Sequence, residues 1–290
     1  MFMTVRLRGL VAAAALSLPL AACGTGATNS TGGGSTNNSA ATSGNISAAG
    51  STALQPLVTA AAGDYQATHS GTKISVTGGG SRTGLGLVVS KAVDLGDSDI
   101  LAQNQPDLID HRVAVIGFAV ITNPGVGVRN LSKQQVRDIF SGKVKNWTAV
   151  GGKQQPITVI NRPASSGTRA VFVKTLMGDT PLDQNTLTED ATGTVVQKVK
   201  QTPGSVSYAA FSGTRNETGI SAISIGGAAP NDANVRSGTY PFWSYEHIYT
   251  NGRPSKQISG FIDFLQSDKA LLQKTGYIAV ADMKVTESDR

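Results

Sequence analysis

Four short segments of this 290-residue chain combine glycine, small hydroxyl residues and a few charges in patterns that suit anion binding. They are 50–54 (Gly-Ser-Thr-Ala-Leu), 78–84 (Gly-Gly-Gly-Ser-Arg-Thr-Gly), 93–99 (Val-Asp-Leu-Gly-Asp-Ser-Asp) and 162–169 (Arg-Pro-Ala-Ser-Ser-Gly-Thr-Arg). In three of them the small residues stand where a helix is expected to begin. The first N–H groups of a helix lack internal partners and carry partial positive charge. Several such ends that converge could replace most of the hydration shell of a small oxyanion.

Each segment taken alone also has an ordinary structural interpretation. Ser and Thr before a helix are common N-caps, and glycines after a strand are common turn residues. Arg162 could equally be a surface arginine, and Asp94, Asp97 and Asp99 could form a solvated loop. These aspartates lack the Gly and the distal Glu of a calcium-binding loop, so we predict neither a metal site nor a cofactor.

Patterns that would indicate an enzyme are weak in this chain. The Gly-x-x-x-x-Gly-Lys-[Ser/Thr] pattern of a P-loop does not occur, and Gly-x-Ser-x-Gly is not completed around Ser81 or Ser166. His69, His111 and His247 occur in no recognisable metal-binding or catalytic spacing. We therefore predict no catalytic residues, with a secreted phosphoester hydrolase as a minor alternative.

The N-terminal 45 residues have the composition of a targeting signal followed by a tether. Arg6 and Arg8 precede a mostly apolar stretch to residue 22, which predicts a secretory signal peptide over 1–22. Leu-Ala-Ala-Cys-Gly at 20–24 resembles the lipobox of bacterial lipoproteins, which implies lipidation of Cys23; a buried structural cysteine is the alternative. Residues 24–45 contain only Gly, Ser, Thr, Asn and Ala, so 23–45 is expected to be the lipidated Cys and a flexible tether. This organisation predicts a lipid-anchored protein on the extracytoplasmic face of the cell membrane.

The charge of the chain does not favour a nucleic-acid partner. The chain has 25 Lys+Arg and 19 Asp+Glu, and loss of the signal with its two arginines leaves 23 − 19 = +4. Nucleic-acid binding calls for clustered basic residues with aromatic residues for stacking. The basic residues here are scattered, and aromatic residues make up only 6% of the chain.

Apolar patterns after residue 45 predict alternating strands and helices. Strands are expected at 73–77, 113–122, 157–161, 206–210 and 220–225. The clearest helix begins at Ser132, which fits a capping box with Gln135, and stops at Gly142. Further helices are expected from Leu54, over 169–177, near 195–199 and over 261–272. Such alternation is typical of an α/β fold with helices over largely parallel sheets.

The four segments, in this order, resemble the phosphate-binding protein of bacterial phosphate ABC transporters, the PstS family. The specific signals are Gly-Ser-Thr-Ala-Leu-x-Pro-Leu from residue 50, Val-Asp-x-Gly-x-Ser-Asp from residue 93 and Arg-x-x-x-Ser-Gly-Thr from residue 162. Residues 243–247 (Trp-Ser-Tyr-Glu-His) and 276–278 (Gly-Tyr-Ile) resemble further landmarks of that family. The resemblance covers about residues 46–290.

This resemblance implies an α/β, periplasmic-binding-protein-like fold of type II, in which two lobes are joined by a hinge of crossing strands. Lobe one would comprise 46–121 plus 238–290, and lobe two 122–237. The implied protein is a monomer that captures inorganic phosphate between its lobes, makes and breaks no bond, and delivers phosphate to the permease subunits of an ABC transporter. Sulfate and molybdate, which are also tetrahedral oxyanions, are the alternative ligands.

The resemblance also implies a set of phosphate-binding residues. The donors would be Thr52, Ala53, Ser81, Arg162, Ser166, Gly167 and Thr168, with Ser51 as an extra candidate. Asp99 would accept the proton that phosphate carries, and it would repel fully ionised sulfate.

One departure from the family pattern concerns the arginine. Many members have an acidic residue between the arginine and Ser-Gly-Thr, where it orients the guanidinium. Here the intervening residues are Pro163, Ala164 and Ser165. Arg169 is therefore an alternative to Arg162, or could share its role.

Overall fold

The computed structural model describes residues 44–289. The predicted signal peptide, Cys23 and the expected tether up to residue 43 lie outside the described residues. Strand β1 (Gly44–Gly50) already begins at Gly44, so the last two residues of the expected tether belong to the sheet and pair with β2 (Thr72–Thr77). Within residues 44–289, no helix is long and apolar enough to cross a bilayer.

The strands form one mixed sheet in the order β2-β1-β3-β10-β4-β8-β6-β7, with β9 beside β4 and β5 beside β9. The other strands are β3 (Leu95–Ser98), β4 (Leu108–Thr122), β5 (Asn130–Leu131), β6 (Thr158–Asn161), β7 (Leu187–Thr188), β8 (Ser205–Ala210), β9 (Ser221–Ile225) and β10 (Trp243–Asn251). Strands β1, β2 and β3 are parallel, as are β6, β7 and β8. All pairings of β4 and β10 are antiparallel. The predicted parallel sheet is therefore found at the two ends, and the prediction is wrong at the centre.

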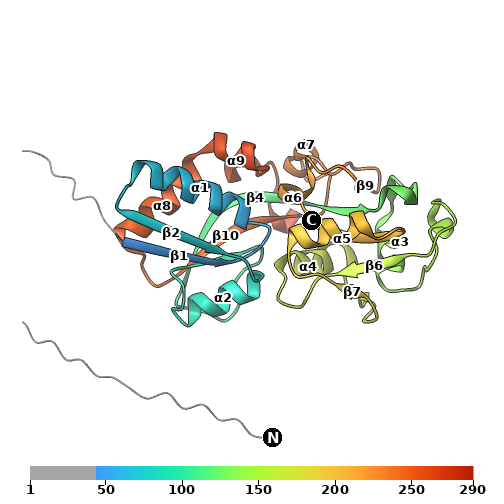
Figure 1. The fold of residues 1–290 in the computed structure, drawn as a ribbon, viewed down its shortest axis with the longest axis horizontal. Coiled ribbons are helices and arrows are strands. Elements are labelled where there is room, and N and C mark those ends of the chain that lie inside the picture. The colour runs from blue at the N-terminus through green and yellow to red at the C-terminus, as the bar shows by residue number, and fades with distance from the viewer. Residues whose placement is uncertain (1–43, 290) are drawn as a thin grey trace, which may run out of the picture. The chain divides into compact units, whose positions relative to one another are not determined.

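Helices alternate with these strands as the apolar pattern predicted. They are α1 (Gln55–Thr68), α2 (Ser81–Val89), α3 (Lys133–Phe140), α4 (Gly167–Phe172), α5 (Thr192–Gln201), α6 (Phe211–Thr214), α7 (Asp232–Arg236), α8 (Lys256–Ser267) and α9 (Lys269–Thr275). In Figure 1, α1, α2, α8 and α9 lie on the left around β1 and β2, and α3, α4 and α5 lie on the right around β6. The helix expected over 169–177 is α4 continued by a π-helical turn, Val173–Met177.

The start of α3 shows how local sequence sets a helix boundary. The N–H of Gln135 donates to Ser132 Oγ at 3.1 Å, and the N–H of Ser132 donates to Gln135 Oε1 at 2.9 Å. This confirms the predicted capping box. Gly142, just beyond the helix, has a φ of 77°, the left-handed conformation that commonly ends a helix.

Strand β4 runs through both halves of the sheet (Figure 1). Its first part, as far as Gly117, pairs with β10, and the part from Phe118 to Thr122 pairs with β8. Residues 113–122 are all buried, which confirms the prediction of a strand covered on both faces. The strand begins at Leu108, earlier than predicted. Residues 108–112 are exposed or half-buried and include Asp110, His111 and Arg112, so the apolar run does not extend over them.

Strand β10 lies between β3 and β4 at the centre of the sheet, and no strand was predicted there. Its residues from Trp243 to Thr250 are buried. They do not form an apolar run, because Ser244, Glu246, His247 and Thr250 interrupt the pattern. The central strand therefore carries polar side chains into the interior.

Candidate anion-binding site

The fold brings the predicted site residues together at the ends of four strands. The turn 51–54 follows β1, glycines 78–80 follow β2, Asp99 follows β3, and Arg162 follows β6. Because β1, β2 and β3 are parallel, their carboxyl ends meet at one edge, where ligands bind in open α/β sheets. Helices α1, α2 and α4 begin close to that edge, so their N-terminal residues face the same place.

Asp99 connects its own segment, 93–99, to the other three. Its carboxylate accepts a hydrogen bond from Thr168 Oγ1 at 2.9 Å and another from Ser51 Oγ. Its backbone N–H donates to Ser81 Oγ at 3.0 Å. Only 2% of Asp99 is exposed, and Asp97 is fully buried. The solvated-loop alternative is therefore wrong for Asp97 and Asp99.

Arg162 is a buried cation in the same site, with 1% of its surface exposed. One terminal nitrogen, Nη2, donates to Thr52 Oγ1 at 3.2 Å and to the carbonyl of Asp190 at 2.8 Å. Its Nε and Nη1 have no hydrogen-bond partner among the described residues. The surface-arginine alternative is therefore wrong, and the Thr52 hydroxyl and the Asp190 carbonyl hold one side of the guanidinium.

Arg169 does not share the position of Arg162. Its Nη1 donates to the backbone carbonyl of Arg162 at 2.8 Å, and its N–H donates to Ser166 Oγ at 3.2 Å. The side chain of Arg169 therefore stabilises the turn that precedes α4.

The start of α4 approaches the opposite wall of the site very closely. Ser166 is the N-cap of this helix, so its hydroxyl is engaged by the helix itself. A Cβ atom at Gly167 would lie 2.1 Å from Ser81 Oγ and 2.9 Å from Asp99 Cβ. Real Cβ contacts are longer than this, so only glycine allows the approach that brings Thr168 to Asp99.

The turn before α1 places Ser51, Thr52 and Ala53 in one cluster. Ser51 Oγ accepts hydrogen bonds from the N–H groups of Ala53 at 3.0 Å and Leu54 at 3.1 Å. Since Ser51 also donates to Asp99, the residue predicted only as an extra candidate lies at the centre of the network.

Sequence reasoning missed Thr192, which joins the site from α5. Its N–H donates to Thr52 Oγ1 at 3.3 Å, and the two hydroxyl oxygens are 3.4 Å apart. Thr-Gly-Thr at 192–194 begins a helix, which is the same signal that identified the other segments. That signal could have found Thr192.

Two further buried carboxyl groups, Asp97 and Glu246, belong to the electrostatic surroundings of Asp99. Burial raises the pKa of each well above its ordinary range, and the Asp99 charge raises both further. Burial also raises the pKa of Asp99, whereas the hydrogen bonds from Ser51 and Thr168 and the Arg162 charge lower it. Asp99 is thus the carboxyl of the three that its surroundings best keep ionised.

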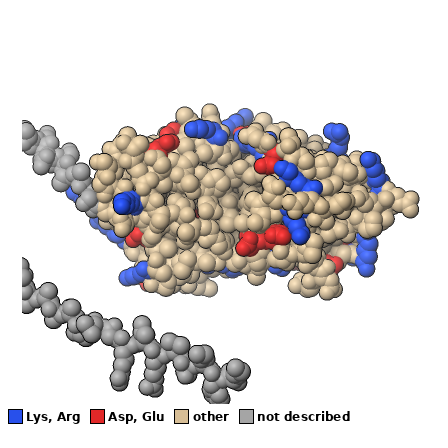
Figure 2. Space-filling view, in the orientation of Figure 1, with Lys and Arg blue, Asp and Glu red and all other residues tan. Residues whose placement is uncertain are grey.

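A groove of about 700 Å³ opens beside Asp99. It lies between α2, the loop after β3, α4 and the C-terminal turn, and its polar lining includes Arg82, Lys174, Ser244 and Glu287. Lys174 Nζ is 3.2 Å from Glu287 Oε2. On the face drawn in Figure 2, basic and acidic side chains are distributed over the surface without a single large patch of either sign.

Comparison with known proteins first places this chain in the PBP superfamily. Residues 35–269 match the family model of the PBP superfamily domain. A crystal structure from Clostridium perfringens, described as a phosphate ABC transporter substrate-binding protein with bound phosphate, superposes with a TM-score of 0.77 at 25% identity and covers 82% of this chain and 100% of that chain. An ABC-type phosphate transport receptor from Vibrio cholerae has a TM-score of 0.66 at 28% identity and covers 80% of this chain and 99% of that chain.

The sequence relatives then give the family. The phosphate-binding protein PstS of Bacillus subtilis (strain 168) is 44% identical over 246 residues, which cover 82% of this chain and 81% of that protein. The protein of the same name from Borreliella burgdorferi is 24% identical over 246 residues, with 80% and 88% covered. The chain therefore belongs to the PstS family of phosphate-binding proteins, as its sequence motifs indicated.

Proposed function

We propose that this chain is an extracytoplasmic solute-binding lipoprotein that captures inorganic phosphate and delivers it to the permease of an ABC transporter. The Bacillus subtilis relative is named a phosphate-binding protein, and the Clostridium perfringens structure is described with bound phosphate. The Vibrio cholerae structure is described as an ABC-type phosphate transport receptor. These names all describe binding and transport proteins, and none of them describes an enzyme.

This proposal rests on one observation: a single buried site holds both N–H donors without partners among residues 44–289 and a carboxylate acceptor. Arg162 offers two N–H-bearing nitrogens without partners among residues 44–289, and Asp99 offers a carboxylate. The ligand must therefore accept charge-assisted hydrogen bonds and also donate a proton. Monohydrogen and dihydrogen phosphate do both, whereas sulfate is fully ionised and would face Asp99 with like charge. This difference favours phosphate over sulfate and molybdate.

Two lobes that close on the ligand fit the arrangement of these contacts. We assign 46–121 plus 238–290 to lobe one and 122–237 to lobe two. The hydrogen bonds from Thr168 to Asp99, from Arg162 to Thr52 and from the N–H of Arg82 to the carbonyl of Ser165 (3.1 Å) then all cross between lobes. A phosphate held by both lobes would favour the closed state, because its contacts are complete only there.

A titration by calorimetry tests the proposed ligand. Residues 24–290, which omit the predicted signal and Cys23, are titrated with phosphate, arsenate, sulfate and molybdate. We expect tight binding of phosphate and weak binding of sulfate and molybdate. A parallel assay with a chromogenic phosphoester is expected to show no turnover, and turnover would instead support the hydrolase alternative.

The proposed location rests on Cys23, which lies outside the described residues. A lipidated cysteine at the mature N-terminus, followed by a tether, would hold a monomeric binding protein next to its permease. The chain is expressed in a bacterial host, fed a palmitate analogue and fractionated. Label and membrane association should both be lost in the Cys23→Ala variant, and labelled, membrane-bound Cys23→Ala protein would contradict the anchor.

A further inference from the structure

The proposed function gives no role to Glu246, a buried acidic residue next to the site. It lies in the central strand β10 and is fully buried. Among residues 44–289, no group donates a hydrogen bond to either carboxyl oxygen of Glu246. The carboxyl of Asp99 lies next to Glu246, and its charge raises the pKa of Glu246. Two carboxyl groups in contact repel each other when both are ionised, and they form a hydrogen bond only when one carries a proton.

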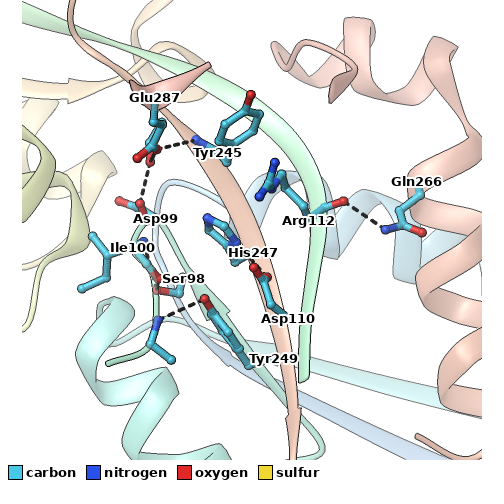
Figure 3. A network of polar contacts seen from close by, with 12 residues as sticks. Ser98, Asp99, Ile100, Asp110, Arg112, Tyr245, His247, Tyr249, Gln266 and Glu287 are labelled. Atoms are coloured by element: carbon cyan, nitrogen blue, oxygen red, sulfur yellow. Dashed lines mark hydrogen bonds and ion pairs between the residues drawn. The ribbon is translucent and has the colours of Figure 1, made fainter. Parts of the chain in front are cut away.

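Strand geometry explains why this carboxyl faces the site. In the pairing of β10 with β3, Ile248 stands opposite Asp97. Side chains two residues apart along a strand lie on the same face, so Glu246 and Asp99 lie on the face of Asp97. The neighbouring residue His247 lies on the other face, where its Nδ1 is 2.7 Å from Asp110 Oδ1 (Figure 3).

The other charged groups around this position do not neutralise Glu246. Asp97 and Asp99 face it from β3 and the residue after it, and both raise the pKa of Glu246. Tyr277, which faces it from the segment after α9, donates its hydroxyl proton to the carbonyl of Ala53. The nearby cation, Arg162, acts on Asp99. Glu246 can therefore remain buried if its carboxyl group carries a proton, because the protonated group has no charge.

We propose that Glu246 is a positioning residue of the phosphate site, which stays protonated and donates a hydrogen bond to the Asp99 carboxylate from behind. This proposal rests on the proposed phosphate-binding function. The bond keeps Asp99 ionised and oriented, with its remaining acceptor capacity free for the proton of phosphate. When Glu246 loses its proton at alkaline pH, two adjacent negative charges weaken anion binding, so the affinity for phosphate falls.

Two substitutions separate this role from simple packing. Glu246→Gln keeps the shape and a donor, but the amide does not titrate. Glu246→Leu fills the space without a donor. We expect Glu246→Gln to bind phosphate within about threefold of the wild type at neutral pH. We also expect its phosphate affinity to fall less than that of the wild type at alkaline pH, because the amide has no proton to lose in this range. We expect Glu246→Leu to bind phosphate at least tenfold more weakly and to discriminate less against sulfate, because an unsupported Asp99 takes up a proton.

The experiment is a calorimetric titration of residues 24–290 with inorganic phosphate and with sulfate, from pH 6 to pH 10, for the wild type and both variants. His247→Gln is the matched control, because it removes a titratable group from the next position of the same strand on the opposite face. Its alkaline profile should follow that of the wild type. Superimposable profiles of the wild type and Glu246→Gln would overturn the role of Glu246 while leaving phosphate binding intact. If the wild type binds no phosphate at any pH, the proposed function and this inference both fail.

A measurement on the wild type keeps the inference testable if a variant does not fold. Infrared spectroscopy of protein with 13C-labelled glutamate carboxyl groups detects the C=O stretch of a protonated glutamate. A band of one protonated glutamate at neutral pH is expected, and it should disappear over the pH range in which phosphate affinity falls. Absence of this band at neutral pH would overturn the inference.

Discussion

The Thr168 hydroxyl donates a hydrogen bond to the Asp99 carboxylate across 69 positions of sequence, and this bond joins the start of α4 to the end of β3. In the proposed division of the chain, the two residues belong to different lobes. In the proposed function, Asp99 therefore has two roles in one position. It accepts a hydrogen bond from Thr168 that would help to hold the lobes closed, and it would accept the proton of the ligand.

Asp99→Asn tests the selectivity that this acceptor provides. An amide removes the negative charge and can donate to an oxyanion, so we expect the rejection of sulfate to relax by at least tenfold. The ratio of phosphate to sulfate affinity, measured by calorimetry, reports this change. Asp94→Asn is the matched control, since Asp94 lies on the same segment as Asp99 but is exposed and bonds to Ser47 of β1. An unchanged ratio in Asp99→Asn would exclude this role for Asp99.

Arg162→Ala should weaken phosphate binding by tenfold or more, which is about 1.4 kcal/mol. The reason is the loss of a buried cation whose Nε and Nη1 have no other partner within residues 44–289. Arg169→Ala serves as the comparison, because Arg169 contacts the backbone of Arg162 and does not hold that buried position. A larger loss of affinity in Arg169→Ala than in Arg162→Ala would reverse the assignment of these two arginines.

Gly167→Ala should prevent closure of the site. The added methyl group would overlap Ser81 Oγ at 2.1 Å, so α4 must move away from Asp99 and Thr168 loses its bond. We expect phosphate binding to fall by at least tenfold, and small-angle scattering with phosphate to show a more open particle than the wild type. Gly193→Ala is the control, because no atom lies within 4 Å of a Cβ atom at Gly193 in α5. Wild-type affinity in Gly167→Ala would show that closure does not need this contact.

The stability of the protein should fall as pH rises above the ordinary carboxyl pKa of about 4. Burial raises the pKa of Glu246 and Asp97 in the folded state, so the folded protein holds protons that the unfolded chain releases. Their contribution to stability is fully present below that ordinary pKa and is lost as pH rises through the raised values. Thermal unfolding of the wild type and Glu246→Gln from pH 4 to pH 9 checks the sign. The variant should lose less stability over this range, and a steeper loss would contradict the raised pKa.

The ion pair between Lys174 and Glu287 should contribute little to ligand affinity. The Lys174 side chain is 67% exposed, and pairs of this kind are worth about 0–1 kcal/mol because water and salt screen them. We expect Lys174→Ala to change the phosphate affinity by less than about threefold at 0.15 M salt. A tenfold loss in a calorimetric titration would show that this pair holds the two sides of the groove together.

Local patterns predicted much of the fold because their causes are local. The capping box of Ser132 and Gln135 depends on residues three positions apart, and the apolar run at 113–122 identifies a buried strand by itself. Strand β10 escaped prediction because its polar side chains find their partners in distant segments. His247 with Asp110 is one such pair, and Ser244 with the backbone carbonyl of Asp99 is another.

The sequence by itself determined which residues could bind an oxyanion, since glycines and small hydroxyl residues at helix starts are visible as motifs and their order indicated the family. Through the family resemblance it also indicated Asp99 as the proposed acceptor. Only the tertiary structure decided which arginine is buried, that Ser51 lies at the centre of the network, and that Glu246 lies behind Asp99. These relationships depend on strand pairing and on burial, which join residues far apart in the chain and alter the chemistry of each.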